Sequence, residues 1–442
     1  MKLQKEKKRS LAEVRKLSSG ARLVVEVMPF LESFSLGFMM PVGSAYESAP
    51  LSGMSHFIEH MLFKGTRRRN PKQIVQAIER VGGAINASTG RESTHIYCRV
   101  ASSRLEVALD VLTDLAFNPL FDPEAIEKEK QVIIEEIKMH EDDPAELIFD
   151  RFIRGVHGNT GFGRPILGSE QTVKAFTPEM VWDFYFAHYK PSSLVVSIAG
   201  DVDPDKVESL LEKKLKGFRR RDEKRGRRAG SPKFKPSLMV YSKDVEQTSL
   251  VMGFPAPGLD SAERYAFLVL DAITAGGMMS RLFQQIREKR GLVYSIDSSH
   301  HAYSSGGLFT VEAGMSEKNL LRVLYLVLKE FKKLAEEGPG KRELADTKLY
   351  LKGNWALGLE SSWMRMVRNA VSVLLFDKVQ SYEEAVEELE AVRREDVMRA
   401  ASKVFDRDGI GIAVLSRFNE EGSVQKVEEK LRETIERVSS GG

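Results

Sequence analysis

The order of secondary-structure elements expected from the sequence repeats in the two halves of the chain. In each half, strand-like runs and shorter helices surround a Gly-Gly pair, and two long helices follow. These long helices are expected at 105–117 and 122–140 and again at 318–336 and 341–357. We interpret 10–217 and 237–440 as diverged copies of one α+β unit. Each copy is expected to be α/β-sandwich-like, with a mostly antiparallel sheet packed against helices.

The segment between the two halves, 218–236, has the composition of a linker. It contains few apolar residues, and seven of the ten residues at 219–228 are basic. The alternative is a phosphate-binding patch, although no aromatic residues alternate with the charges. A second segment, 150–181, contains several glycines and is expected to be loop-rich.

Composition limits the classes of function that this chain can have. Its net charge of +3 gives no case for nucleic-acid binding, and no stretch approaches the 18 apolar residues of a membrane span. Cys98 is the single cysteine, so an intrachain disulfide and a cysteine-based zinc site are excluded. Any metal must therefore bind to histidine and carboxylate. Residues 1–16 do not resemble a secretory signal, and we expect a cytoplasmic protein.

One predicted helix, at 54–63, combines an apolar stripe with a face of chemically active side chains. Apolar residues recur with helical spacing, and His56, Glu59 and His60 fall together on the opposite side. Two histidines four positions apart can bind one metal ion, and a neighbouring glutamate that is not a ligand can act as a base. The order His-x-x-Glu-His is the inverse of the commoner His-Glu-x-x-His. The alternative is a chance arrangement of two structural histidines.

The predicted helix at 122–140 carries a second candidate group. Its start is marked by Asp122 as a cap, followed by proline. Glu129 and Glu136 lie two turns apart on the flank of the apolar side, whereas Glu135 points away from it. Acidic groups at the edge of a buried face are costly unless they have a partner, and a metal is one such partner. Partly solvated helix carboxylates explain the pattern equally well.

Taken together, these motifs resemble those of the pitrilysin/insulinase family of inverzincin zinc peptidases. The resemblance lies in His56-Phe-Ile-Glu-His60 with Glu136 76 residues after His60. Three further phrases match, at 82–87 (GGAINA), 129–136 (EKQVIIEE) and 280–294 (SRLFQQIREKRGLVY). The chain length of two units looks like that of the mitochondrial processing peptidase β subunit and its bacterial relatives. The resemblance covers residues 13–420 or so.

For the metal site, the resemblance implies a definite set of roles. His56, His60 and Glu136 would bind one Zn²⁺ per chain, and Glu59 would be the general base. Glu129 would be the supporting acid that members of the family place seven residues before the glutamate ligand. Three protein ligands would leave zinc with an open position, as in catalytic sites.

For substrate and partners, the resemblance implies contributions from both halves. Asn86 and Ala87 would lie in the edge strand that pairs with the substrate backbone. Arg287 and Tyr294 of the second half would assist catalysis in the site of a facing chain. We therefore expect a homodimer, or a heterodimer with a related chain, that acts on peptide substrates.

The function implied is that of a zinc-dependent metalloendopeptidase that hydrolyses peptides or extended polypeptide segments. The alternative is a non-catalytic structural or partner subunit of the same fold. Such subunits typically lose the zinc ligands or the base, and this sequence keeps all of them.

Overall fold

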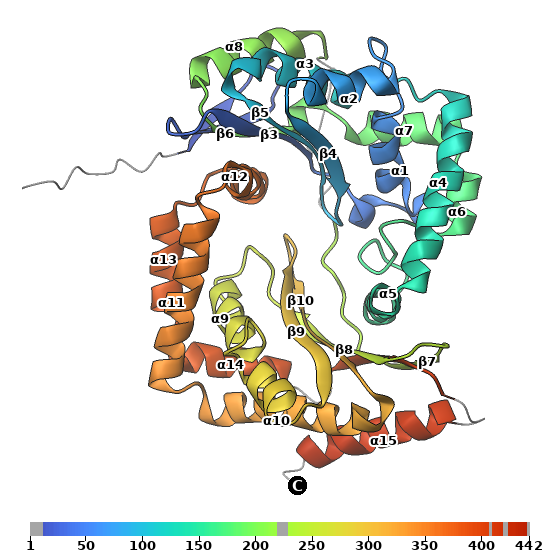
Figure 1. Cartoon of the computed structure of the whole chain (residues 1–442), viewed down its shortest axis with the longest axis vertical. Helices are drawn as coiled ribbons and strands as arrows, with labels where there is room; N and C mark the ends of the chain where they lie inside the picture. Colours follow the sequence, from blue (N-terminus) through green and yellow to red (C-terminus); the bar gives the residue numbers. More distant parts are fainter. Residues whose placement is uncertain (1–11, 219–228, 406–408, 419–422, 440–442) are drawn as a thin grey trace, which may run out of the picture. The chain divides into compact units, whose positions relative to one another are not determined.

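A computed structural model of the chain describes residues 12–218, 229–405, 409–418 and 423–439. The chain divides into two compact units that are not contiguous in sequence. The first comprises 1–135, 166–229 and 355–382, and the second comprises 136–165, 230–354 and 383–442. Each contains a sheet and helices, so the predicted α+β class is confirmed (Figure 1). Among the described residues, no helix is long and apolar enough to cross a membrane.

The sheet of the first unit has the order β1-β2-β6-β3-β5-β4. Its strands are β1 (Glu13–Lys16), β2 (Arg22–Val27), β3 (Ser33–Met40), β4 (Ala84–Thr89), β5 (Thr94–Ala101) and β6 (Val195–Gly200). β2 and β6 are parallel, and the other neighbouring pairs are antiparallel. β4 stands last in this order, so among the described strands it forms an edge of the sheet.

Helices cover both faces of this sheet (Figure 1). α3 and α8 pack on one face, and α12 packs across β2, β6 and β3 on the other. The helices of this unit are α1 (Met54–Leu62), α2 (Pro71–Glu79), α3 (Leu105–Phe117), α4 (Pro123–Asp142), α6 (Glu170–Ala175), α7 (Pro178–His188), α8 (Pro204–Leu215) and α12 (Ser362–Phe376). The division between units passes through α4, which is a continuous helix.

The second unit repeats the plan with the sheet order β7-β11-β8-β10-β9. Its strands are β7 (Leu238–Ser242), β8 (Thr248–Ala256), β9 (Val293–Ala302), β10 (Gly307–Met315) and β11 (Gly411–Ser416). β7 and β11 are parallel, and the following pairs are antiparallel. Its helices are α5 (Pro144–His157), α9 (Arg264–Thr274), α10 (Leu320–Glu337), α13 (Tyr382–Ala391), α14 (Arg394–Val404) and α15 (Ser423–Ser439), and α11 (Lys341–Gly358) spans the division.

Each sheet is covered by a helix from the other half of the chain. α5 lies in the N-terminal half of the sequence, yet Phe152 packs with Val251 and Leu308 of the second sheet. α12 lies in the C-terminal half, yet Ala370 and Val373 pack with strands of the first sheet. The compact units therefore differ from the contiguous halves 10–217 and 237–440. Of the predicted linker, 219–228 lies outside the described residues.

Within the segment expected to be loop-rich, 158–169 is without helix or strand, but most of the rest of 150–181 is helical. This stretch contains the end of α5, all of α6 and the start of α7. Asp143, Ser169 and Thr177 each accept a backbone hydrogen bond in the first turn of one of these helices. Apart from Gly155 inside α5, the glycines of this stretch lie in the connection between α5 and α6. Side-chain caps thus start new helices on both sides of a glycine-rich turn.

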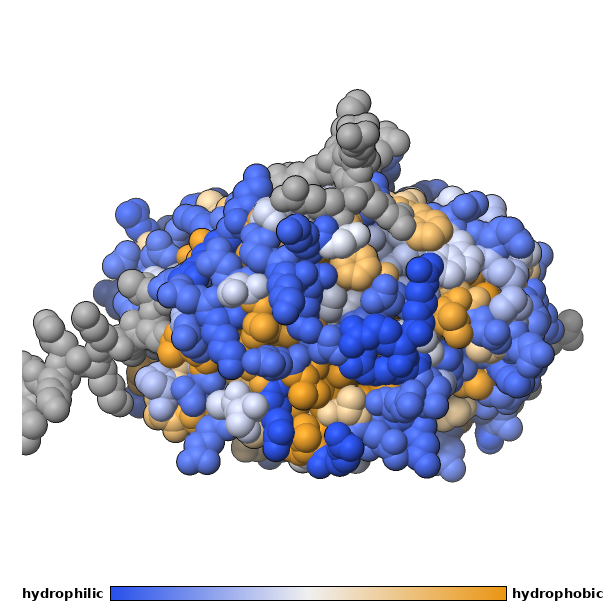
Figure 2. Space-filling view, turned by 90° about the horizontal axis from the view of Figure 1, so that it is seen from above, coloured by the Kyte–Doolittle hydropathy of each residue, from blue (hydrophilic) through white to orange (hydrophobic). Residues whose placement is uncertain are grey.

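Burial of the apolar stripes leaves polar side chains outside. The face of the molecule in Figure 2 is mainly hydrophilic, with hydrophobic residues in small groups. This distribution is expected when amphipathic helices turn their apolar sides to the sheets.

Candidate metal centre

Helix α1 buries one side and presents the other to the candidate site, as predicted. Met54, Phe57, Ile58, Met61 and Leu62 are all fully buried. The side chains of the motif are on the opposite side, where the first histidine is 8% exposed and the second is partly exposed. The prediction of an amphipathic helix is thus confirmed.

The N-terminal end of α1 is held by a carboxylate that sequence reasoning missed. Glu47 is buried, and its two oxygens accept hydrogen bonds from the backbone N–H groups of Gly53 (2.8 Å) and Ser55 (2.7 Å). Gly53 has a φ of 94°, and an added Cβ would lie 2.6 Å from the Leu167 carbonyl oxygen. The helix therefore starts at a fixed place because a negative group caps its amides and only glycine fits the turn.

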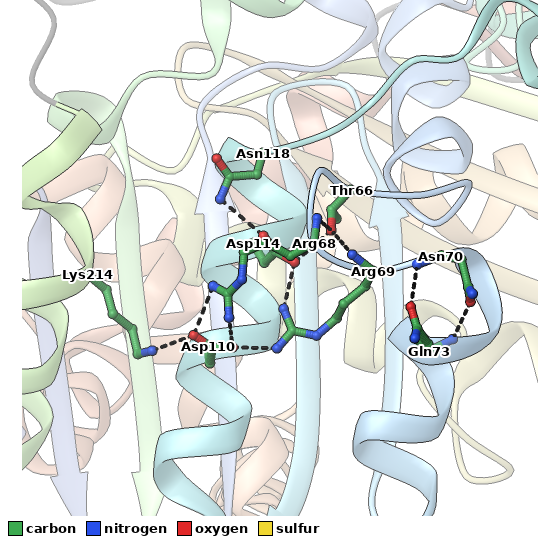
Figure 3. A network of polar contacts seen from close by, with 9 residues as sticks. All are labelled: Thr66, Arg68, Arg69, Asn70, Gln73, Asp110, Asp114, Asn118 and Lys214. Carbon is green, nitrogen blue, oxygen red and sulfur yellow. Dashed lines mark hydrogen bonds and ion pairs between the residues drawn. The ribbon is translucent and has the colours of Figure 1, made fainter.

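The segment that follows α1 is anchored to α3 by a network of polar contacts, and α3 is in turn paired with α8 (Figure 3). Asp114 of α3 is 1% exposed and accepts hydrogen bonds from Thr66 Oγ1 (2.7 Å) and Arg69 Nη1 (2.6 Å). One turn earlier, Asp110 pairs with Lys214 Nζ of α8 at 2.7 Å. Both ends of α1 are thus fixed to the surrounding fold.

Helix α4 places its acidic residues as the periodicity predicts. Asp122 Oδ1 accepts a hydrogen bond from the Ala125 N–H and caps the helix. Glu129 is 3% exposed and Glu136 is partly buried, whereas Glu135 is exposed. The prediction that the first two flank the buried side is confirmed.

His56, His60 and Glu136 come together as a possible ligand group. One donor atom from each lies within 4.8 Å of the others. Burial, together with a smaller effect of the neighbouring His60, lowers the pKa of His56 to about 3. The His56 imidazole is therefore neutral at pH 7, which is the form that binds metals. Two imidazole nitrogens and one carboxylate oxygen fit a zinc ion.

Glu129 orients one of the two histidines. Its Oε1 lies 2.8 Å from His60 Nδ1, and its Oε2 lies 2.6 Å from Lys64 Nζ. Burial raises the pKa of Glu129, but the hydrogen bonds from His60 and Lys64 outweigh it and hold the pKa below its ordinary value. Because an ionised carboxylate can only accept, His60 Nδ1 carries the hydrogen and Nε2 is left as the metal-binding atom.

Glu59 is linked to the edge strand of the first sheet. Thr89 Oγ1, at the end of β4, donates a hydrogen bond of 2.5 Å to Glu59 Oε2. Asn86 and Ala87 lie earlier in β4, opposite Tyr97 and Ile96 of β5. Asn86 is exposed, and its Oδ1 accepts the Ala87 N–H at 2.9 Å. Sequence reasoning identified the strand but missed Thr89.

The two remaining predicted residues lie in the second unit. Arg287 belongs to a π-helical segment, Phe283–Glu288, and its guanidinium lies 4.8 Å from the centre of the Phe283 ring. Tyr294 is in β9 and is 74% exposed. π-Helical turns frequently occur at functional sites. The catalytic roles of Arg287 and Tyr294 stay predictions.

Comparison with known proteins agrees with this combination of fold and site. A family model described as "Insulinase (Peptidase family M16)" matches 22–170, and one described as "Peptidase M16 inactive domain" matches 175–351. An uncharacterized zinc protease of Bacillus subtilis is 34% identical over 88% of this chain and 95% of its own length. One from Mycobacterium tuberculosis H37Rv is 35% identical over 95% of both chains.

Solved structures show the same fold at lower sequence identity. A protease from Helicobacter pylori has a TM-score of 0.85 and 21% identity, with 92% of this chain and 99% of that chain covered. A peptidase M16 inactive domain from Pseudomonas fluorescens has a TM-score of 0.83 and 20% identity, with 93% and 99% covered. The family model and the sequence relatives are those of a zinc peptidase family. The chain belongs to the insulinase family, peptidase family M16, and the resemblance seen in its motifs is confirmed.

Proposed function

We propose that this protein is a zinc-dependent endopeptidase that cleaves peptides or extended segments of polypeptides. The observation that carries the proposal is the group of His56, His60 and Glu136, with donor atoms within 4.8 Å of one another. Three protein ligands are typical of catalytic zinc sites, which keep a position open. A zinc ion held there would supply Lewis-acid chemistry, because it polarises a peptide carbonyl and makes water more acidic.

Glu59 is the proposed general base. It lies on the same helix as both histidines, and Thr89 holds one of its oxygens. Its carboxylate takes a proton from the attacking water and later delivers that proton to the leaving amine. The hydrogen bond from Thr89 keeps the carboxylate in one orientation for both transfers.

The edge of β4 is the proposed docking place for substrate. Asn86 and Ala87 lie on this edge strand, and the Ala87 N–H donates to the side-chain oxygen of Asn86 at 2.9 Å. A peptide that added to this edge would bind through main-chain hydrogen bonds, which read the backbone rather than the side chains. We therefore expect loose sequence preference and a requirement for an unfolded segment.

The protein is further proposed to act as a homodimer in which Arg287 and Tyr294 of one chain complete the site of the other. The 74% exposure of Tyr294 leaves its hydroxyl accessible to a partner chain. In that position, the phenol and the guanidinium would stabilise the negative charge that develops on the scissile carbonyl oxygen. A heterodimer with a related chain is the alternative assembly.

The central test is the substitution Glu59→Gln, which removes the proposed general base. Zinc content, measured by mass spectrometry of the purified protein, should stay at the wild-type level, and cleavage of a mixed peptide library should stop. Glu135→Gln is the matched control, because Glu135 lies on the exposed side of α4 and should leave cleavage unchanged. Unchanged cleavage by Glu59→Gln would defeat the proposal. A zinc-loaded wild-type protein without any cleavage would favour the non-catalytic subunit.

Completion of sites between chains is tested by mixing two inactive variants. Glu59→Gln and Tyr294→Phe chains are denatured together and refolded in equal amounts. Mixed dimers make up about half of the population, and each has one intact site, so about a quarter of wild-type activity should return. No recovery, with mixed dimers verified by differently tagged chains, would exclude completion in trans.

A further inference from the structure

Lys64 continues a row of basic side chains on α1. His56, His60 and Lys64 follow one another at intervals of four residues. Although α1 ends at Leu62, Phe63 keeps right-handed helical backbone angles, and the Lys64 N–H donates to the Met61 carbonyl at 3.1 Å. Lys64 therefore lies about one further turn along the same side of the helix as the two histidines.

Two acidic side chains of α4 lie next to these three basic residues. Glu136 forms the candidate ligand group with His56 and His60. Glu129 lies between His60 and Lys64, with one oxygen 2.8 Å from the imidazole and the other 2.6 Å from the ammonium. The later acid of α4, Glu136, is thus near the earlier residues of α1, and the earlier acid, Glu129, is near the later ones. The two helices therefore run antiparallel here.

Burial makes the partner of the second Glu129 oxygen important. The Glu129 side chain is only 4% exposed, whereas the Lys64 side chain is 36% exposed. A carboxylate so deeply buried is costly unless each oxygen has a hydrogen-bond donor. Lys64 meets this need at small cost, because its ammonium remains partly in water.

We propose that Lys64 is a positioning residue for the metal centre. Its ammonium fixes the Glu129 carboxylate, and that carboxylate fixes the ring of His60 with Nε2 turned to the metal. Mutation of a residue that hydrogen-bonds to a metal ligand typically changes metal affinity by about 10- to 100-fold. Lys64 contacts such a residue, Glu129, rather than the ligand itself, so we expect its loss to weaken zinc binding about tenfold. The inference rests on the proposed zinc site.

The test measures zinc affinity directly, without an activity assay. Zinc-free protein is titrated in competition with a chelator of known affinity. Lys64→Met removes the donor, Lys64→Gln keeps a neutral donor, and Lys64→Arg keeps the charge. Lys403→Met is the control, because it removes a lysine with a similar 2.7 Å ion pair, to Glu263, away from α1 and α4. Unfolding of the zinc-free forms by urea shows whether each variant folds.

We expect Lys64→Met to bind zinc about tenfold more weakly than wild type, and Lys64→Arg to recover most of the loss. The Lys403→Met control should bind zinc like wild type. Wild-type affinity in both Lys64→Met and Lys64→Gln would overturn the inference while leaving the zinc site intact. Equal weakening in Lys64→Met and Lys64→Arg would also overturn it, since the charge would then be irrelevant. Failure of the wild-type protein to bind zinc would overturn the proposed function as well.

Discussion

Thr89 Oγ1 donates a hydrogen bond of 2.5 Å to Glu59 Oε2 and so ties the end of strand β4 to helix α1. β4 is the edge strand on which substrate is proposed to bind, and Glu59 is the proposed base. One hydroxyl therefore connects the substrate strand with the group that transfers protons.

Replacement of Thr89→Val should lower kcat about tenfold, because a hydrogen bond to a charged group contributes about 1.5–3 kcal/mol. Valine keeps the shape of the side chain but cannot donate. The measurement is steady-state cleavage of a peptide chosen from the library, with zinc content determined in parallel. Thr89→Ser keeps the hydroxyl and should recover most of the rate. A wild-type kcat in Thr89→Val would show that the hydrogen bond has no part in catalysis.

The cap formed by Glu47 predicts a loss of stability. Glu47→Ala leaves the N–H groups of Gly53 and Ser55 without their carboxylate acceptor in a buried setting. The free energy of unfolding of the zinc-free protein should fall by about 2 kcal/mol. Urea unfolding measures this change, and Glu47→Gln should lose less because its amide oxygen can still accept. Equal stability of Glu47→Ala and wild type would contradict the assigned role.

A buried ion pair holds α12 on the first sheet, and breaking it should lower stability more than loss of the Glu47 cap does. Glu26 of β2 is 6% exposed, and its carboxylate pairs with Arg365 and accepts a hydrogen bond of 2.7 Å from Asn369 Nδ2. Glu26→Leu leaves the guanidinium uncompensated and should destabilise the protein by about 3 kcal/mol in urea. Adding Arg365→Met should restore part of this loss. The exposed pair of Lys174 with Glu170 is the control, and its loss should cost under about 1 kcal/mol.

Asp271 predicts a dependence of stability on pH. Burial raises its pKa from the ordinary value of 3.8 to about 6, and the hydrogen bond from Ser298 only partly opposes this. Because the folded state favours the protonated form, this group stabilises the fold below pH 4 or so and loses that contribution as pH rises through about 6. The side chain of Asp271→Asn cannot ionise. The unfolding free energy of this variant, relative to that of wild type, should therefore be about 2 kcal/mol higher at pH 7.5 than at pH 4.5. Urea unfolding at both pH values checks the difference, and a constant difference would contradict the prediction.

Local periodicity accounts for the parts of the site that could be foreseen. The faces of α1 and α4 follow from 3.6 residues per turn, so the positions of His56, His60, Glu129 and Glu136 relative to the buried side were predictable. At 150–181 the glycines correctly indicated the loop at 158–169, but the helices on either side of it were missed. The capping residues Ser169 and Thr177 were the signals that could have revealed the helices there.

The residue pattern was sufficient to place the two histidines and the flanking acids on their helix faces, because these positions depend on neighbours within a few turns. Folding was needed to bring Glu47 to the start of α1, Thr89 to Glu59 and Lys64 to Glu129. Folding also placed α5, from the N-terminal half, on the second sheet and α12, from the C-terminal half, on the first sheet. Apart from the Glu47 cap, which spans only six to eight residues, these contacts join residues that are distant in sequence. They depend on how helices and strands pack together, which no local spacing encodes.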